Sequence, residues 1–206
     1  MSEAELHVIR ARLLGGILNK ARRGELRCRL PVGFVYDAAG RVVFDADIQV
    51  QESVRVLFDT FARTGTLYAT IRYFRQGGLL FPSRVAAGAE KGQLAWAPLS
   101  LGRVSSTLHN PWYAGAYAYG RGRWRAQPDG RQRHERLPRD QWQVLIPNVH
   151  PAYISWQEYE RNEQRLKESS KAAGFERSAG PAREGPALLQ GRAVCGPVRQ
   201  PHARAL

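Results

Sequence analysis

The sequence predicts an α+β fold that is rich in helices and carries a small hairpin and an arginine-rich, wing-like ribbon. Apolar residues recur at helical spacing in five separate stretches. Short aromatic and β-branched runs, bounded by Gly, Pro or Asp, lie between them and are typical of strands. A hydrophobic fraction of 43% over 206 residues is enough to fill the core of one domain.

The first predicted helix begins at Ser2 and Glu5, whose spacing is that of a Ser-x-x-Glu capping box. Its apolar residues at helical spacing are Leu6, Ile9, Leu13 and Ile17. Gly15 and Gly16 each cost about 1 kcal/mol within a helix, so we expect this helix to lean on a neighbour or on DNA. It passes into residues 20–29, which we expect to form a flexible basic arm.

Residues 33–44 predict a hairpin with its turn at 37–40. A second helix is expected over 47–63, and its buried face consists of Val50, Val54, Leu57, Phe58 and Phe61. Thr66 is placed to cap a third helix that ends at Gly77-Gly78. The inward residues of this third helix are Leu67, Ile71 and Phe74.

Residues 79–93 are expected to form a loop with a strand-like start that Pro82 interrupts. Pro98 suits the first turn of a fourth helix, which Asn110-Pro111 ends. Its expected buried stripe is Leu101, Val104 and Leu108, and its expected polar face is Ser100, Arg103, Ser106 and Thr107.

The remaining segments alternate strands and loops before a last helix. Residues 113–125 predict a strand or ribbon, 127–136 a polar loop and 142–146 a short strand. A final helix is expected over 154–171. After residue 173 the chain is rich in Gly, Pro, Ser and Ala, which predicts a flexible tail.

The formal net charge of +13, from 31 basic and 18 acidic residues, indicates a polyanionic partner such as nucleic acid. Arginine supplies 27 of the cations, and its planar guanidinium binds phosphate and guanine in a bidentate manner. A GC-rich genome would explain the ratio of Arg to Lys but not the net charge. The cations cluster in two regions, 103–139 with eight arginines and two acids, and 20–29 with five cations and one acid.

A polar-faced helix followed by an arginine-rich ribbon matches a helix-plus-wing DNA reader. The helix would enter the major groove, the ribbon would follow phosphates and the arm would lie in the minor groove. The alternative is a solvated charged face, and for the fourth helix an ordinary packing helix. The candidate DNA-binding residues are Lys20, Arg22, Arg23, Arg27 and Arg29 in the arm, Arg103, Ser105, Ser106 and His109 in the helix, and Arg121, Arg123 and Arg125 in the ribbon.

Residues typical of catalysis or metal binding are poorly arranged in this sequence. Ser100, Ser105 and Ser106 have no obvious general base beside them, and the five histidines lack metal-ligand spacing, so we expect no catalytic residue, metal or cofactor. His150 is expected to be a hydrogen-bonded turn residue. Cys28 and Cys195 are too far apart in sequence to suggest a disulfide framework. No signal peptide or membrane span is evident, which predicts a cytoplasmic setting.

Several segments resemble one family, and they occur in the family's order. Residues 2–26 resemble the end of a long helix and its linker, and 30–33 the opening of a recombinase domain. Residues 108–115 (LHNPWYAG) and 150–159 (HPAYISWQEY) resemble its signatures, and 182–191 the approach to its zinc ribbon. The chain therefore resembles the middle of the large serine recombinases, which are site-specific integrases and transposases.

The resemblance implies a division of labour. In the family an N-terminal domain supplies the serine that attacks DNA phosphate, while the recombinase domain and zinc ribbon hold the attachment site. It implies four segments here: the end of a linker helix with a basic arm (1–30), the recombinase DNA-binding domain (31–150), a C-terminal helix (151–173) and a flexible tail with an aborted zinc ribbon (174–206). No catalytic residue carries over, so we expect no strand cleavage by the chain alone.

The expected partner is double-stranded attachment-site DNA in the integration of a mobile element, with the chain monomeric on its own. A separately encoded catalytic domain would be a second partner if the gene is half of a split recombinase, and a degenerate remnant is the other possibility. A helix-turn-helix transcriptional regulator remains the alternative function, and an active enzyme is a third. The tail reads Cys195-Gly-Pro-Val-Arg-Gln-Pro-His202, and one inserted nucleotide would convert a Cys-x-x-Cys ribbon into it, so we expect residues 197–206 to be out of frame and Cys195 to lack zinc.

Overall fold

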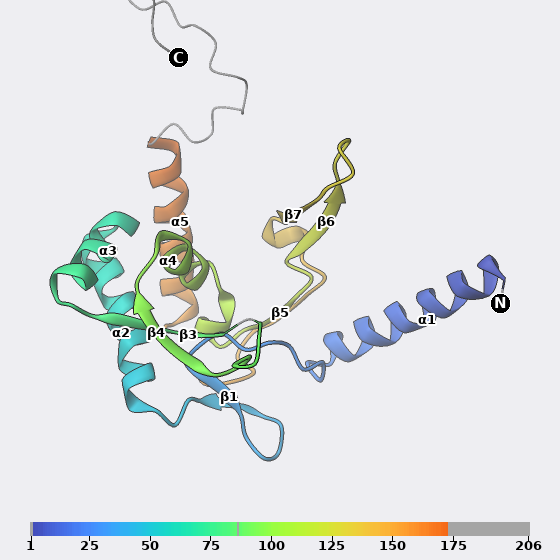
Figure 1. Cartoon of the computed structure of the whole chain (residues 1–206), viewed down its shortest axis with the longest axis horizontal. Coiled ribbons are helices and arrows are strands. Elements are labelled where there is room, and N and C mark those ends of the chain that lie inside the picture. Colours follow the sequence, from blue (N-terminus) through green and yellow to red (C-terminus); the bar gives the residue numbers. More distant parts are fainter. Residues whose placement is uncertain (1, 86, 173–206) are drawn as a thin grey trace, which may run out of the picture. The chain divides into compact units, whose positions relative to one another are not determined.

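A computed structural model describes residues 2–85 and 87–172 (Figure 1). The unit that runs to Lys167 is treated below. Our expectations for the tail, including Cys195 and the out-of-frame segment, lie outside the described residues. The elements are, in order, α1 (Glu3–Arg22), β1 (Phe34–Tyr36), β2 (Val42–Phe44), α2 (Ile48–Thr64), α3 (Leu67–Gln76), β3 (Leu80–Arg84), β4 (Leu94–Pro98), α4 (Leu101–Leu108), η1 (Pro111–Ala114), β5 (Tyr117–Tyr119), β6 (Gly122–Ala126), β7 (Gln132–Arg136), η2 (Arg139–Gln141), β8 (Val144–Ile146) and α5 (Trp156–Ala172).

The strands of the described part form four two-stranded antiparallel ladders, β1–β2, β3–β4, β5–β8 and β6–β7. Three of these join neighbours in sequence. The fourth, β5–β8, pairs Tyr117 with Ile146 across the whole β6–β7 segment. The chain enters the β6–β7 hairpin from β5 and returns to β8, so the β5–β8 ladder holds the two ends of the hairpin segment together. The α+β, helix-rich fold with a small hairpin and a wing-like ribbon is confirmed.

The main core is built on the apolar face of α2. All five residues predicted for that face are buried: Val50, Val54, Leu57, Phe58 and Phe61. Aromatic rings from distant segments complete it, because Phe34 lies 5.7 Å from Tyr113 and 5.2 Å from Tyr153 between ring centroids. The Tyr113 hydroxyl donates to the carbonyl of Val32 at 2.9 Å, which ties the segment before β1 to this core.

The helix boundaries predicted for the first three helices agree with the local chemistry. Ser2 and Glu5 form the expected capping box, and the side chains of Asp47 and Thr66 cap α2 and α3. Gly65 ends α2 with φ of 71°, a left-handed conformation that favours glycine. The hairpin at 33–44 is also confirmed as β1–β2.

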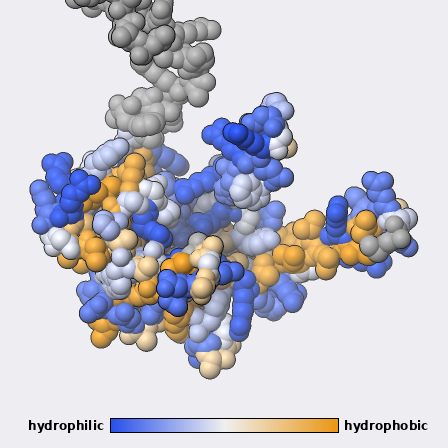
Figure 2. Space-filling model, viewed as in Figure 1, coloured by the Kyte–Doolittle hydropathy of each residue, from blue (hydrophilic) through white to orange (hydrophobic). Residues whose placement is uncertain are grey.

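Along most of its length α1 does not lean on a neighbouring segment of the described chain, so the other expected support, DNA, stays a prediction. Its apolar residues are exposed along most of its length, and Figure 2 shows them on its surface. They are Leu6, Ile9, Leu13 and Ile17. Nothing lies within 4 Å of a side chain built at Gly15 or Gly16. Only the last turn is buried, where Ala21 joins a small cluster with Trp112, Tyr117 and Val144.

The strand-like start predicted for 79–93 is the strand β3, but Pro82 does not interrupt it. β3 pairs with β4, and Pro82 lies inside β3 opposite Trp96. The backbone N–H of Val85 donates to the carbonyl of Gln93 at 2.9 Å. In an antiparallel ladder, hydrogen-bonded and non-hydrogen-bonded pairs alternate, so the pair of Pro82 and Trp96, three positions further on, is not hydrogen-bonded. The missing N–H of Pro82 therefore costs no ladder hydrogen bond, which is why the strand tolerates proline.

The fourth helix begins three residues later than Pro98 suggested. Pro98 ends β4, and Ser100 caps α4 by accepting from the backbone N–H of Arg103 at 3.3 Å. Val104 and Leu108 are buried as predicted. Leu101, in contrast, is 41% exposed at the first position of the helix, and Thr107, predicted for the polar face, is buried.

The ribbon predicted over 113–125 is divided among three elements. Residues 111–114 form the 3-10 helix η1, and the chain then enters β5 and, after Gly120, β6. The predicted polar loop at 127–136 is also wrong in its second half, because Gln132–Arg136 is the strand β7. Its polar residues pair across the hairpin and need no buried face. The last strand and helix fall close to their predicted positions, as β8 and α5.

Candidate nucleic-acid interface

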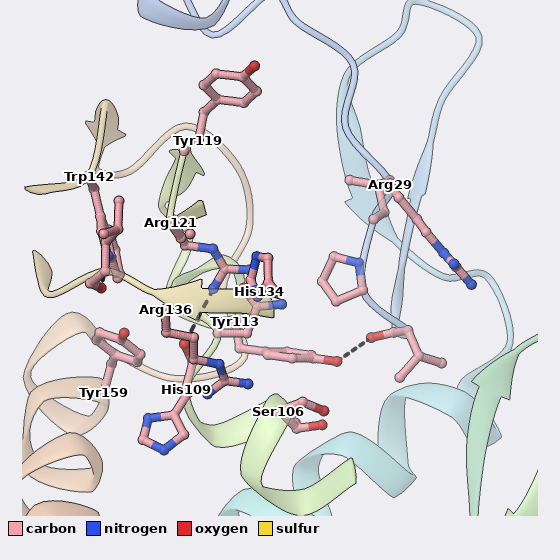
Figure 3. A pocket seen from close by; sticks show the side chains of 18 of the residues that line it. Arg29, Ser106, His109, Tyr113, Tyr119, Arg121, His134, Arg136, Trp142 and Tyr159 are labelled. Atoms are coloured by element: carbon pink, nitrogen blue, oxygen red, sulfur yellow. Dashed lines mark hydrogen bonds between the residues drawn. The ribbon is translucent and has the colours of Figure 1, made fainter. Parts of the chain in front are cut away.

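A cleft of about 1140 Å³ lies between the segment before β1, α4 and the base of the β6–β7 hairpin (Figure 3). Its lining is strongly cationic. Five arginines and two histidines face one carboxylate, that of Glu163. The basic lining residues are Arg29, Arg84, Arg103, Arg121, Arg136, His109 and His134. We call this cleft the arginine groove.

The wall formed by α4 presents polar groups at its exposed face. Arg103 and Ser106 are both exposed and both line the groove. The Ser106 hydroxyl donates to the carbonyl of Arg103 at 3.0 Å. The side chain of Arg103 forms no ion pair with any acid in the described part of the chain. Ser105 is half-buried and does not line the groove, unlike its predicted role.

His109 is held by protein contacts on two sides. It lies at the C-terminal cap of α4, where its Nδ1–H donates to the carboxylate of Glu163 on α5. Its backbone carbonyl accepts from Nη1 of Arg121 at 3.4 Å, as the dashed line in Figure 3 shows. His109 therefore links α4 to α5 and to the start of the hairpin, in addition to lining the groove.

Arg121 differs from the other arginines of the predicted ribbon. It precedes β6 and is half-buried in the groove, with its guanidinium 6.0 Å from the ring centroid of Trp142. Burial lowers the pKa of Arg121, and Glu163 opposes that effect. Figure 3 shows Arg121 and Arg136 both directed into the groove. Arg121 thus lines the groove. The sequence had instead suggested that it alternates with Arg123 and Arg125 along one exposed ribbon.

The two strands of the hairpin place arginines on one face. Arg123 pairs with Glu135 at 3.0 Å, and this hydrogen bond lowers the pKa of the Glu135 carboxyl. Arg125 lies directly opposite Arg133, so two like charges face each other with no acid between them. Opposed like charges destabilise a ladder, and a bound polyanion would relieve that repulsion. Figure 2 shows that the hairpin surface is mainly hydrophilic.

The predicted arm is attached to the core rather than free. The Tyr36 hydroxyl donates to the carbonyl of Cys28 at 2.9 Å and accepts from its N–H at 3.0 Å. The Tyr117 hydroxyl donates to the carbonyl of Leu26 at 3.3 Å. These hydrogen bonds hold the backbone of the segment in place. The side chains of Leu26 and Cys28 also pack against the small cluster around Trp112. The expectation of a flexible arm at 20–29 is therefore wrong, because residues 20–22 belong to α1 and the backbone of Leu26 and Cys28 is hydrogen-bonded to the core.

The basic residues of this segment have separate surroundings. Lys20 and Arg22 lie in the last turn of α1, where cations are favoured by the helix dipole. Arg23 pairs with Glu25 at 2.8 Å. The guanidinium of Arg27 lies 5.3 Å from the ring centroid of Tyr36. Arg29 lines the arginine groove and donates to the carbonyl of Arg84 at 3.2 Å.

The groove thus brings together five of the twelve predicted residues: Arg29, Arg103, Ser106, His109 and Arg121. Arg123 and Arg125 lie on the hairpin outside it, and the other predicted residues do not line it. Sequence reasoning missed Arg84, Arg136 and His134. The last two fell in the supposed polar loop. The alternation of Arg133, Glu135 and Leu137 with His134 and Arg136 was the signal that could have revealed a strand.

The structure bears on three smaller expectations. His150 is a turn residue as predicted, and its Nδ1–H donates to the carbonyl of Pro151 at 2.8 Å. Within residues 2–85 and 87–172, no group of three His, Cys, Asp or Glu side chains is placed to hold a metal ion. No helix in the same residues combines the length and apolar character needed to cross a membrane.

Comparisons with known proteins agree with the resemblance found in the sequence. The sequence model of the Recombinase family matches residues 49–169. A protein of Sinorhizobium fredii, described as "Uncharacterized protein y4bA/y4pH", is 51% identical over 199 residues. The match covers 95% of this chain but 28% of that relative, so the chain spans less than a third of the relative's length.

Two solved structures share the fold. The crystal structure of an LSR–DNA complex, where LSR stands for large serine recombinase, matches with a TM-score of 0.51 at 14% identity over 82% of this chain and 42% of that one. A structure concerning the sequence requirements of the Listeria innocua prophage attP site matches with a TM-score of 0.51 at 13% identity, over 92% and 63% of the two chains. Since the family model also matches more than half of the residues, the chain belongs to the Recombinase family, the recombinase domain found in the C-terminal region of large serine recombinases.

Proposed function

We propose that this domain binds a duplex DNA attachment site during site-specific recombination. The observation that carries the proposal is the arginine groove, which five arginines line beside the exposed face of α4; of these, Arg84 pairs with Asp45 at 2.8 Å and the other four have no carboxylate partner among the described ion pairs. A cleft with this excess of positive charge attracts the phosphate backbone. The family and the LSR–DNA complex of the same fold support DNA as the polyanion.

The groove and α4 suit different parts of the recognition. Arg103 lies near the start of α4 with its guanidinium unpaired by any described acid, and a guanidinium in that position can bind O6 and N7 of guanine in a bidentate manner. The Ser106 oxygen, one turn later, can accept a hydrogen bond from a base amino group while its hydroxyl donates to the carbonyl of Arg103. Arg29 and Arg136, on the other walls, are placed to neutralise the backbone on either side.

The biological setting follows from the same proposal. We place the binding step in the integration of a mobile element, with strand exchange performed by a catalytic domain outside the described residues. Two serines of α4 have structural roles: Ser100 caps the helix and the Ser106 hydroxyl donates to a helix carbonyl. Incubation of this chain with duplex DNA should give no covalent adduct on a denaturing gel. An adduct would show that the chain itself carries a nucleophile for DNA phosphate.

The test of DNA binding compares groove and control arginines. A fluorescein-labelled duplex of mixed sequence is titrated with the wild type, Arg103→Ala, Arg136→Ala and their double variant, and anisotropy gives the dissociation constants. The matched control is Arg161→Ala, which removes the same charge from an exposed position on α5 outside the groove. We expect the double variant to bind about tenfold or more weakly, and the control to bind like the wild type.

Two outcomes would contradict the proposal. A wild-type chain that binds neither this duplex nor a library of random duplexes at low salt has no DNA-binding function. Equal losses in the double variant and in Arg161→Ala would mean that binding depends on overall charge and does not use the groove.

A further inference from the structure

Trp124 is exposed in a way that the other tryptophans are not. Its exposed fraction is 67%, whereas Trp112 is buried and the remaining three are half-buried. Two of those half-buried rings use their indole N–H within the protein, Trp142 to the carbonyl of Leu137 and Trp156 to Glu160. Trp124 lies on β6, and the described hydrogen bonds include none from its indole. A ring this large at the surface suggests a contact with another molecule.

The hairpin holds Trp124 on the face that leads into the arginine groove. Trp124 lies opposite His134 across the ladder, with their rings 5.1 Å apart and nearly perpendicular. Because side chains alternate along a strand, Trp124 shares its face with Gly122, and His134 shares it with Arg136. Gly122, His134 and Arg136 all line the groove. The aromatic pair therefore continues the groove outward along the hairpin.

The opposite face of the same hairpin supplies positive charge. Arg123, Arg125 and Arg133 lie there, and the residues from 121 to 137 include six arginines and two acids. Both acids, Asp129 and Glu135, already pair with an arginine. An occupant that reaches Trp124 thus contacts a hairpin on which Arg125, Arg133 and Arg136 have no carboxylate partner among the described ion pairs, with Arg136 on the same face as Trp124. This charge favours nucleic acid over a protein or an apolar surface as the partner of the ring.

We propose that Trp124, supported by His134, packs against a nucleobase of the duplex held in the arginine groove and partly unstacks one base step. The inference rests on the proposed DNA binding and deepens it by naming an aromatic contact. Apolar side chains can be inserted between base steps when nearby cations hold the phosphates. His134 limits the orientations of the indole, so less freedom is lost when the ring meets a base.

The experiment places 2-aminopurine, whose fluorescence rises when it leaves the base stack, at successive positions of a duplex that the wild type binds. The variants are Trp124→Ala and Trp124→Phe. The matched control is Tyr68→Ala on α3, since Tyr68 is an aromatic residue of similar exposure, 68%, outside the groove. Because Trp124 is exposed, Trp124→Ala should keep its fold, and circular dichroism checks this.

We expect the wild type to raise 2-aminopurine fluorescence at one or two adjacent positions. Trp124→Ala should lose that signal and bind about tenfold to a hundredfold more weakly, as for other base–aromatic contacts. Trp124→Phe should retain part of both. The slope of log affinity against log salt should stay unchanged in all three, because no phosphate contact is lost.

Failure of this inference is distinguishable from failure of DNA binding itself. If the wild type binds duplex with a normal salt slope but Trp124→Ala binds equally well, the aromatic contact is wrong and the proposed function stands. The same holds if Trp124→Ala weakens binding no more than Tyr68→Ala does. A loss of affinity without any 2-aminopurine signal in the wild type would overturn the unstacking and leave the ring against the outside of the duplex. Absence of wild-type binding would remove both proposals.

Discussion

Two basic segments of similar charge are built in opposite ways. Residues 23–32, the linking segment, carry their arginines on a backbone that is hydrogen-bonded to Tyr36 and Tyr117. The β6–β7 hairpin pairs its two strands only with each other. In the linking segment, Arg23 has a carboxylate partner and Arg27 lies over a ring. The number of arginines in a segment therefore does not by itself predict which of them are available to a ligand.

The cause of the difference is visible in the residues between the arginines. Leu26, Cys28 and Leu30 alternate with Arg27 and Arg29, so every second side chain of the linking segment can be buried against the small cluster. The hairpin has a short aromatic pair and otherwise polar or small residues at the corresponding positions. Alternating apolar residues therefore attach the linking segment to the protein. The hairpin has few apolar residues in such positions and stays exposed.

The largest expected effect tests which segment contacts phosphate. Replacing Arg123, Arg125 and Arg133 by Ala should weaken duplex binding roughly a hundredfold at low salt and reduce the slope of log affinity against log salt by about two to three. Replacing Arg22, Arg23 and Arg27 by Ala removes the same charge from the linking segment and the end of α1. This second triple variant should change the slope of log affinity against log salt by less than half as much as the hairpin variant. Anisotropy titrations across a salt series measure both, and equal changes would break the comparison.

Local signals in the sequence predicted much of the fold. The capping box at Ser2, the cap at Thr66 and the buried face of α2 all depend on residues a few positions apart. The β3–β4 hairpin was missed because Pro82 suggested a break. Whether a strand tolerates proline depends on which ladder pair it occupies, and that register comes from a partner strand more than ten residues away.

The arginine groove could be predicted only in part. The exposed residues of α4 and the charge of the ribbon were visible in the sequence. The groove also needs the β5–β8 pairing, which joins residues 117–119 to 144–146, and the approach of Glu163 to His109 from α5. Contacts between such distant residues leave no periodic pattern. For the same reason the sequence could not show that Arg121 is turned inward while Arg123 and Arg125 are exposed.

A second prediction sharpens the comparison at the base of the hairpin. Arg121→Ala removes the contact with Trp142 and the hydrogen bond to the His109 carbonyl. It should lower the free energy of unfolding by about 2 kcal/mol, measured by urea titration. Its effect on the salt slope should be smaller than that of Arg125→Ala, which in turn should raise stability slightly because it removes the repulsion from Arg133. The reverse pattern would make Arg121 a phosphate contact, as its sequence position suggested.

A third prediction concerns the hydrogen bonds of the linking segment. Tyr36→Phe removes a hydroxyl that both donates to and accepts from the backbone of Cys28. The unfolding free energy should fall by about 1 kcal/mol, while the salt slope of DNA binding stays that of the wild type. Tyr68→Phe is the control, because Tyr68 is exposed and no described hydrogen bond uses its hydroxyl. An equal effect of the two variants would mean that the segment is not held by Tyr36.

The smallest expected effect is a pH dependence of the unfolding free energy, which arises at His150 near the linking segment. His150 lies between Phe34 and Trp112, with ring centroids 5.1 and 5.0 Å away. Its Nδ1–H is used by the carbonyl of Pro151, and Nε2 is buried without a partner among the described residues. Burial therefore lowers the pKa of His150 below its ordinary 6.5, although the bond to Pro151 opposes the change.

The sign of the effect follows from which state binds the proton more readily. The unfolded chain protonates His150 near its ordinary pKa, and the folded chain only at lower pH. The free energy of unfolding should thus be fully present above about pH 6.5 and decline below it, by at most about 1.4 kcal/mol per pH unit. Urea titrations through this range should show a shallower decline in His150→Gln than in the wild type. Since His150 contacts Trp112 in the cluster that holds the linking segment, an undiminished decline in the variant would mean that the proton is taken up elsewhere.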